Sequence, residues 1–229
     1  STAAIRELAA AAEEFERVGL PDRHAALRDL GEALADAGSA RAARTALARA
    51  DRGEHPGAER RAHRVFSRTA RVRLALGEGD LRRARAVAGR ALDVARRTPG
   101  HAARIAAHLA VGEAALRGGE LVEARQAAEA ALAFAREEGD PLAAAAAERI
   151  LAELAARAGR TGEASERAHR AARAYTGRVD AGDGPARLLL ALGRGLSRAE
   201  PARASAYLAR AKGCYQRLKG LGFRPPEGA

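Results

Sequence analysis

The chain has 229 residues, of which 47% are apolar, and most of the apolar residues are alanine. This content is sufficient for a continuous core, but aromatic residues make up only 3% and Trp and Met are absent, so the core must form by close approach of packed helices. The formal charge of +11 comes almost entirely from arginines that are interleaved with 29 acidic residues, and this pattern, without aromatic stacking platforms, argues against a nucleic-acid groove.

Cysteine content and apolar runs restrict the class further. Cys214 is the only cysteine, which excludes a disulfide framework and a thiolate zinc site and fits a reducing cytoplasm. No apolar run approaches the roughly 20 residues of a membrane span, and no signal peptide is visible. Because the chain begins with Ser1 rather than methionine, we interpret it as a segment of a larger protein.

The first predicted element is a single helix within residues 1–20. Its apolar positions follow the helical period, and they are Ala4, Leu8, Ala11 and Phe15. Gly19 and Pro21 end this helix. Since no helix precedes it, the segment is predicted to be the second half of a helix pair.

Five helix pairs follow, and four of them have a glycine at the inner turn, where a helix C-cap needs a left-handed residue. The turn glycines include Gly38, Gly79, Gly119 and Gly159, and the prolines between pairs are Pro21, Pro56, Pro99, Pro141 and Pro185. First helices are predicted at about 22–37, 58–77, 101–117, 141–158 and 185–198. Second helices are predicted at about 40–51, 80–97, 120–138, 161–176 and 201–219. Asp140 and Pro141 fit an N-cap followed by proline at the first helical position.

Small residues recur with a period of forty. Two such series are Ala84, Ala124, Ala164, Ala204 and Ala91, Ala131, Ala171, Ala211, and the third copy shows the whole pattern as Gly112, Ala115, Gly119, Ala124, Ala128 and Ala131. Alanine at a crossing of antiparallel helices lets the axes approach to near the lower end of the usual 8 to 10 Å. A larger side chain would overpack the crossing at a cost of roughly 1 to 3 kcal/mol. These alanines therefore predict the seams between helices.

This small-residue skeleton resembles the tetratricopeptide repeat over essentially the whole chain, in the longer form of about forty residues that is similar to repeats of bacterial signalling ATPases, transcription regulators and assembly scaffolds. The resemblance implies an all-α fold, a right-handed α–α superhelix of about five repeats after a half repeat at 1–20. The repeats are expected at about 22–52, 58–98, 101–139, 141–177 and 185–220, with a tail at 221–229.

The resemblance also implies that the first helices line a concave groove. Carrying the family's groove positions over by register gives Phe66, Thr69, Arg73, Leu109, Glu113, Arg117, Arg149, Glu153, Arg157 and Leu189, with Gly193 beside the last. This mixture would suit a peptide or helix with apolar anchors and acidic residues, and Arg73, Arg149 and Arg157 are the best candidates for gripping carboxylates. The alternative is that Arg149 and Glu153, spaced by four, pair on a solvated helix face.

Catalytic and metal chemistry have no candidate constellation. His101 and His108 are seven residues apart, and His63 follows Glu59 by four, but no third ligand accompanies either pair, so exposed or capping histidines are expected. The segment 77–80 lacks the rest of a phosphate loop and is predicted to be a repeat turn. Glu137 and Glu138 are expected to point apart into solvent, and Cys214 to be a buried small thiol.

We therefore expect a non-catalytic, cytoplasmic protein-interaction module without cofactor or metal, part of a bacterial signalling, regulatory or assembly protein, that binds a possibly acidic peptide or helix in its groove. Two alternatives stay open: a ligand-sensing regulatory domain of an ATPase or transcription regulator, and an arginine-rich scaffold associated with nucleic acid. Neither nucleic acid nor a membrane is the expected partner. Self-association is a further option, through an apolar stripe of Leu208, Tyr215, Leu218, Leu221 and Phe223.

Overall fold

The computed structural model describes residues 2–18, 23–36, 39–51, 57–175, 184–197 and 200–219. All regular secondary structure in these ranges is α-helical, which confirms the predicted all-α class. None of the described helices is long and apolar enough to cross a bilayer.

The described part of the chain contains a single opening helix and five helix pairs. The opening helix is α1 (Thr2–Val18). The first helices of the pairs are α2 (Arg23–Asp36), α4 (Gly57–Gly77), α6 (His101–Gly118), α8 (Pro141–Arg157) and α10 (Gly184–Leu196). The second helices are α3 (Ala40–Ala50), α5 (Leu81–Ala95), α7 (Leu121–Glu138), α9 (Thr161–Tyr175) and α11 (Pro201–Lys219). Each bound lies close to its predicted position, because glycine, proline and N-cap residues end these helices locally.

The turns inside the pairs form as predicted. Gly79, Gly119 and Gly159 have φ values of 73°, 85° and 72°, in the left-handed region that only glycine adopts without strain. The side chain of Asp140 accepts hydrogen bonds from the backbone N–H groups of Leu142 and Ala143 at 3.0 and 2.9 Å, with Pro141 at the first helical position. Gly38, Pro21 and Pro56 lie outside the described residues.

The alanines that recur every forty residues lie at the helix seams. In the two series quoted above, no alanine is more than 3% exposed. Gly112 lies at such a crossing too, since a Cβ there would be 3.3 Å from Ile150 Cδ1 and 3.7 Å from Ala127 Cβ. The interpretation of the small residues as contact positions is confirmed, and it explains how a core with few aromatic residues reaches dense packing.

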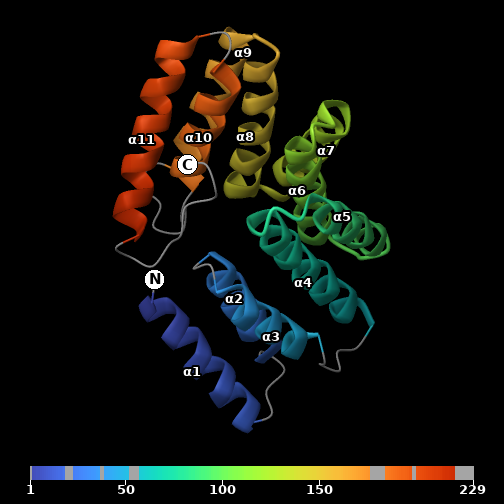
Figure 1. Cartoon of the computed structure of the whole chain (residues 1–229). Helices are drawn as coiled ribbons and strands as arrows, with labels where there is room; N and C mark the ends of the chain where they lie inside the picture. The colour runs from blue at the N-terminus through green and yellow to red at the C-terminus, as the bar shows by residue number, and fades with distance from the viewer. Residues whose placement is uncertain are drawn as a thin grey trace.

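Successive pairs pack on one another in a regular way. Each second helix packs against its own first helix, and most pack closely against the next first helix; α1 packs on α2 as α5 packs on α6 and α7 on α8. First helices also contact the next first helix, from α2 and α4 through to α8 and α10. Figure 1 shows the pairs following one another along a curve that runs from α1 to α11.

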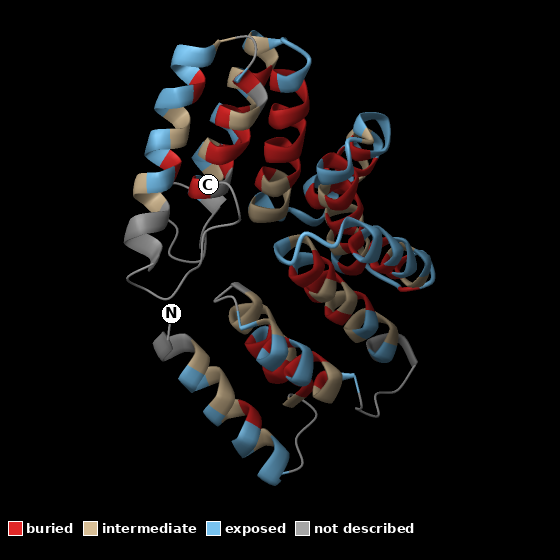
Figure 2. Ribbon diagram, in the orientation of Figure 1, coloured by how far each residue is buried: buried red, intermediate tan, exposed pale blue. Residues whose placement is uncertain are grey.

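Helix α8 is buried on nearly every side because it contacts α6, α7, α9 and α10. All residues from Ala147 to Ala156 are buried, including the charged Glu148, Arg149 and Glu153. Figure 2 shows this helix coloured as buried over most of its length, whereas the neighbouring second helices have an exposed side. Its charged residues must therefore find partners on neighbouring helices.

Candidate functional site

The predicted groove residues of the second, third and fourth repeats share one face of the first helices, which we call the first-helix face. Between α2 and α4, the Arg73 guanidinium lies 2.5 Å from a Glu32 carboxylate oxygen. The Arg28 guanidinium lies 5.3 Å from the centroid of the Phe66 ring, within cation–π range. Residues at matching positions of neighbouring repeats thus meet across the gap between their helices.

The same face continues from α6 to α8. Arg149 of α8 forms an ion pair with Glu113 of α6. Arg157 of α8 donates a hydrogen bond of 3.2 Å to the backbone carbonyl of Leu116, in the last turn of α6, where carbonyls lack an intrahelical partner. Arg157 also forms an ion pair with Glu153 one turn before it. These contacts fix α8 against α6.

Two of the predicted groove residues on α8 are not accessible. Arg149 is 7% exposed and Glu153 is 3% exposed, so neither side chain is accessible to a partner. The alternative prediction, that the two residues pair on a solvated helix face, is therefore wrong. The reason is the burial of α8 between two other first helices. Arg149 is therefore not accessible to a carboxylate of a partner, because it forms an ion pair with Glu113.

The fifth repeat departs from the predicted register. A Cβ at Gly193 would lie 2.6 Å from Leu208 of α11, and Leu189 packs in the same α10–α11 cluster beside Cys214. Gly193 thus faces the second helix of its own pair and is not an open groove position, whereas Leu189 is half-buried like Phe66 and Leu109. Leu208 of the predicted C-terminal stripe is half-buried in this contact. The side chains of Tyr215, Leu218, Leu221 and Phe223 lie outside the described residues.

The accessible part of the first-helix face on α4 and α6 combines apolar and cationic residues, while Arg157 on α8 is also exposed but is engaged by Glu153 and the Leu116 carbonyl. Phe66 and Leu109 are half-buried, and Arg117 is exposed without an ion pair among the described residues. Arg73 keeps 53% of its side chain exposed beside Glu32. Thr69 is buried and donates a hydrogen bond of 2.8 Å to the Phe66 carbonyl. This surface therefore offers two apolar side chains and two arginines at neighbouring positions.

The histidines of α6 are organised around an aromatic ring, contrary to the expectation of exposed or capping residues. The ring centroids of His101 and His108 lie 5.4 and 5.8 Å from that of Phe134 on α7. Burial lowers the pKa of His108, and the positive charge of Arg96 lowers it further. The described residues contain no cluster of His, Cys, Asp and Glu that could hold a metal ion.

The two glutamates that end α7 were expected to point apart into solvent. Both are exposed, but both approach the same imidazole: Glu137 lies 3.6 Å from His101 Nε2 and Glu138 lies 3.5 Å from His101 Nδ1. Two adjacent residues of a helix thus contact the same side chain, although they were expected to point apart. His101 lies at the start of the neighbouring first helix, which brings one ring within reach of both.

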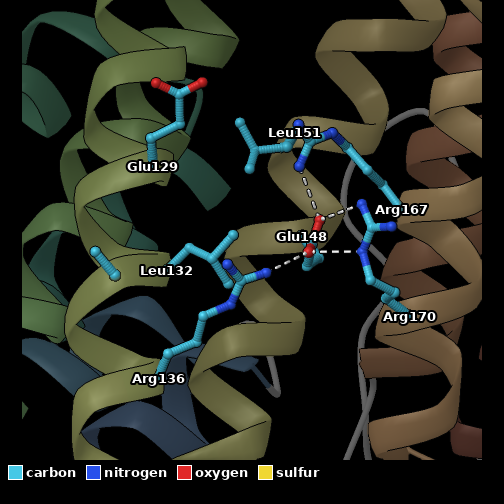
Figure 3. Close-up of a pocket in the computed structure, with 8 residues that line it drawn as sticks. Glu129, Leu132, Arg136, Glu148, Leu151, Arg167 and Arg170 are labelled. Atoms are coloured by element: carbon cyan, nitrogen blue, oxygen red, sulfur yellow. Dashed lines mark hydrogen bonds and ion pairs between the residues drawn. The ribbon is translucent and has the colours of Figure 1, made fainter.

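A pocket of about 380 Å³ lies on another side of α8, between the second helices α7 and α9 (Figure 3). Glu148 forms its base and is 3% exposed. Three arginines converge on the Glu148 carboxylate: Arg136 from α7 at 3.4 Å, and Arg167 and Arg170 from α9 at 3.0 and 2.9 Å. The remaining lining residues are Glu129, Leu132, Ala133 and Leu151.

The charges in this pocket are mutually satisfied. Burial alone would lower the pKa of Arg167, but hydrogen bonds to Glu163 and Glu148 outweigh it and raise that pKa. The hydrogen bond from Arg167 in turn lowers the pKa of Glu163. The buried carboxylate of Glu148 thus holds three second-helix arginines in place, and the cluster joins α7, α8 and α9.

Sequence reasoning missed this cluster, although a signal for it is present. At the repeat position of Glu148 the first and fifth repeats carry Leu27 and Leu188, both of which are buried. A glutamate that replaces the buried leucine of the first and fifth repeats indicates a buried charge in need of cationic partners. Arg167 and Arg170 supply them from the next helix.

Comparison with known proteins adds no assignment. No family model matches the sequence, and no curated protein and no solved structure gives a significant match.

Proposed function

We propose that this protein is a non-catalytic, cytoplasmic protein-interaction module of the tetratricopeptide type. In this proposal the helix pairs form a right-handed superhelix whose first helices line the inner surface. A partner binds there as an extended acidic peptide or as an amphipathic helix with acidic residues. The sections of this surface on α4 and α6 make the main contacts.

The packing of the two helix layers supports a curved array. First helices contact one another directly from repeat to repeat. Between the second helices α7 and α9, in contrast, lies the pocket of about 380 Å³. A layer whose helices touch has a smaller radius than a layer whose helices are separated, and this difference supports a concave side formed by the first helices.

The chemistry of the first-helix face supports an acidic partner. Phe66 and Leu109 present apolar surface at neighbouring repeats, and Arg73 and Arg117 are the accessible arginines beside them. Apolar anchors flanked by guanidinium groups are suited to a peptide that alternates aliphatic and acidic residues. The observation that carries the proposal is this combination of half-buried apolar residues and accessible arginines on two adjacent first helices.

The proposal is tested by selecting binders from a displayed library of acidic amphipathic peptides and measuring their affinity by isothermal titration. Reversing two charges, with Arg73→Glu and Arg117→Glu, is expected to weaken binding at least tenfold, or about 1.4 kcal/mol. The matched control reverses Arg82 and Arg97, which are also exposed and have no ion pair among the described residues. Equal affinity of the two double variants, or a library that yields no binder, would refute the proposal.

A further inference from the structure

In the register of the repeats, the counterpart of the pocket in Figure 3 lies between α3 and α5 over α4, and we call this place the notch. Two repeats before Glu148, the same position is Arg68. The pocket residues Leu132, Leu151 and Arg170 likewise correspond to Asp51, Arg71 and Arg90. At the matching position, the internal carboxylate of Glu148 is thus replaced by the guanidinium of Arg68.

The carboxylate that does lie in this notch is already engaged. Asp51 accepts a hydrogen bond of 2.6 Å from the Ser67 hydroxyl and lies 2.6 Å from the Arg71 guanidinium. Arg71 also donates a hydrogen bond of 3.5 Å to the Leu47 carbonyl, near the end of α3. One aspartate thus balances one arginine, and the other arginines of the notch have no ion-pair partner among the described residues.

Several guanidinium groups around Arg68 have unused donors. Arg68 Nη1 is buried without a hydrogen-bond partner. Arg64 and Arg90 are exposed, and neither forms an ion pair among the described residues. A buried N–H without an acceptor is energetically unfavourable, and more so in a charged group, so a bound anion that accepts a hydrogen bond from Arg68 would remove this cost.

The electrostatics of Arg68 agree with an unfilled anion site. Burial lowers the pKa of Arg68, and although Asp51 acts in the opposite direction, the charges of Arg64, Arg90 and Arg71 lower it further. Like charges gathered at a partly buried position repel one another unless a negative group lies between them. In the pocket between α7 and α9 the protein supplies that group itself, as Glu148.

We propose that the notch formed by α3, α4 and α5 binds a phosphate group, held by Arg64, Arg68 and Arg90. Planar guanidinium groups match the oxygens of phosphate in a bidentate manner. A phosphate monoester carries nearly two negative charges at neutral pH, which suits three unpaired arginines better than a single carboxylate does. This site lies among second helices and is independent of the first-helix face.

The test measures binding of inorganic phosphate by isothermal titration at constant ionic strength, with chloride replaced by phosphate. Wild type is expected to bind with a Kd on the order of 1 mM or lower. Arg68→Leu is expected to weaken this binding at least tenfold and still fold, because Leu27 and Leu188 occupy the same repeat position. Arg90→Leu is expected to weaken binding similarly, and Arg82→Leu on the same helix to leave it unchanged.

A second variant fills the site from within. Arg68→Glu places a carboxylate at the repeat position of Glu148, so it is expected to raise the melting temperature of phosphate-free protein and to abolish phosphate binding. Absence of phosphate binding by wild type at about ten times the expected Kd would overturn the proposal. Equal binding by wild type, Arg68→Leu and Arg90→Leu would overturn it too.

Further arms identify the source of the phosphate and test its selectivity. A phosphoserine peptide that binds more tightly than phenyl phosphate supports a phosphorylated protein partner as the source, whereas phenyl phosphate binding as tightly as the peptide supports a small phosphorylated molecule. The unphosphorylated peptide is the control for the first arm. Acetate that binds as tightly as phosphate would contradict the phosphate assignment.

Discussion

Glu148 provides the most quantitative test of the ion cluster between α7, α8 and α9. Replacing it with glutamine keeps the side-chain volume but removes the charge that three arginines share. Removing one partner of a buried ion pair typically costs about 3 to 5 kcal/mol. Two of the three arginines, Arg136 and Arg170, have side chains that are 64% and 47% exposed, so they can turn into water, and their share of this cost is small.

Arg167 carries most of the remaining effect. Its side chain is 19% exposed, and it keeps Glu163 at 2.8 Å after the substitution. The loss thus amounts to about one charge-assisted hydrogen bond to a largely buried guanidinium, which is worth about 1.5 to 3 kcal/mol. Glu148→Gln is therefore expected to lower the free energy of unfolding by about 2 kcal/mol, with a fall in melting temperature of roughly 4 to 8 °C for a chain of this size.

Thermal and urea denaturation followed by circular dichroism measure this change. The control is Glu129→Gln: Glu129 lines the same pocket but is exposed, and its one ion pair among the described residues is with Arg125, at 3.9 Å. It is expected to change the free energy of unfolding by less than about 0.5 kcal/mol. If the two variants were equally stable, the cluster around Glu148 would have no role in joining the three helices.

Four more substitutions test the seams and the histidine cluster. Ala131→Leu, at a fully buried crossing, is expected to lower the free energy of unfolding by roughly 1 to 3 kcal/mol in urea denaturation, and a neutral result would contradict the seam. Gly193→Ala is expected to destabilise the protein, because the new Cβ would lie 2.6 Å from Leu208 and 3.2 Å from the Ala204 carbonyl. Gly112→Ala, whose nearest contact would be the Ile150 methyl at 3.3 Å, is expected to gain up to about 1 kcal/mol of stability from helix propensity. The reverse order of melting temperatures would refute these contacts. Folding lowers the pKa of His108 from its ordinary value of 6.5, so the unfolded chain binds this proton at higher pH, and the free energy of unfolding falls as the pH drops from 6.5 to the folded pKa. His108→Gln is expected to remove this part of the pH dependence of the urea midpoint. An unchanged pH profile would exclude His108 as its source.

Helix positions could be predicted from the sequence because their determinants are local. Gly119 needs a left-handed backbone, and Asp140 caps the helix that follows it. The forty-residue recurrence of residues such as Ala131 then fixed which positions lie at helix crossings. These features depend on backbone sterics and on side-chain size, both of which can be read from residue type and spacing.

Side-chain partners were less predictable because they depend on which helix lies across the gap. Arg149 and Glu153 have the spacing of a pair within one helix, yet Arg149 pairs with Glu113, in the preceding first helix. The periodicity also could not show that α8 is buried on nearly every side, since its sequence resembles that of more exposed first helices. In the fifth repeat, contacts with Leu208 on α11 turn Gly193 away from the predicted groove.

The most direct test of the first-helix face as the binding surface is site-specific photocrosslinking with a selected acidic peptide. A benzophenone side chain is placed at Arg117, on α6, and in a second protein at Arg82, on α5; both positions are exposed. Crosslinking from position 117 but not from position 82 is the predicted result. Crosslinking from position 82 alone would contradict the assignment of the binding surface to the first helices.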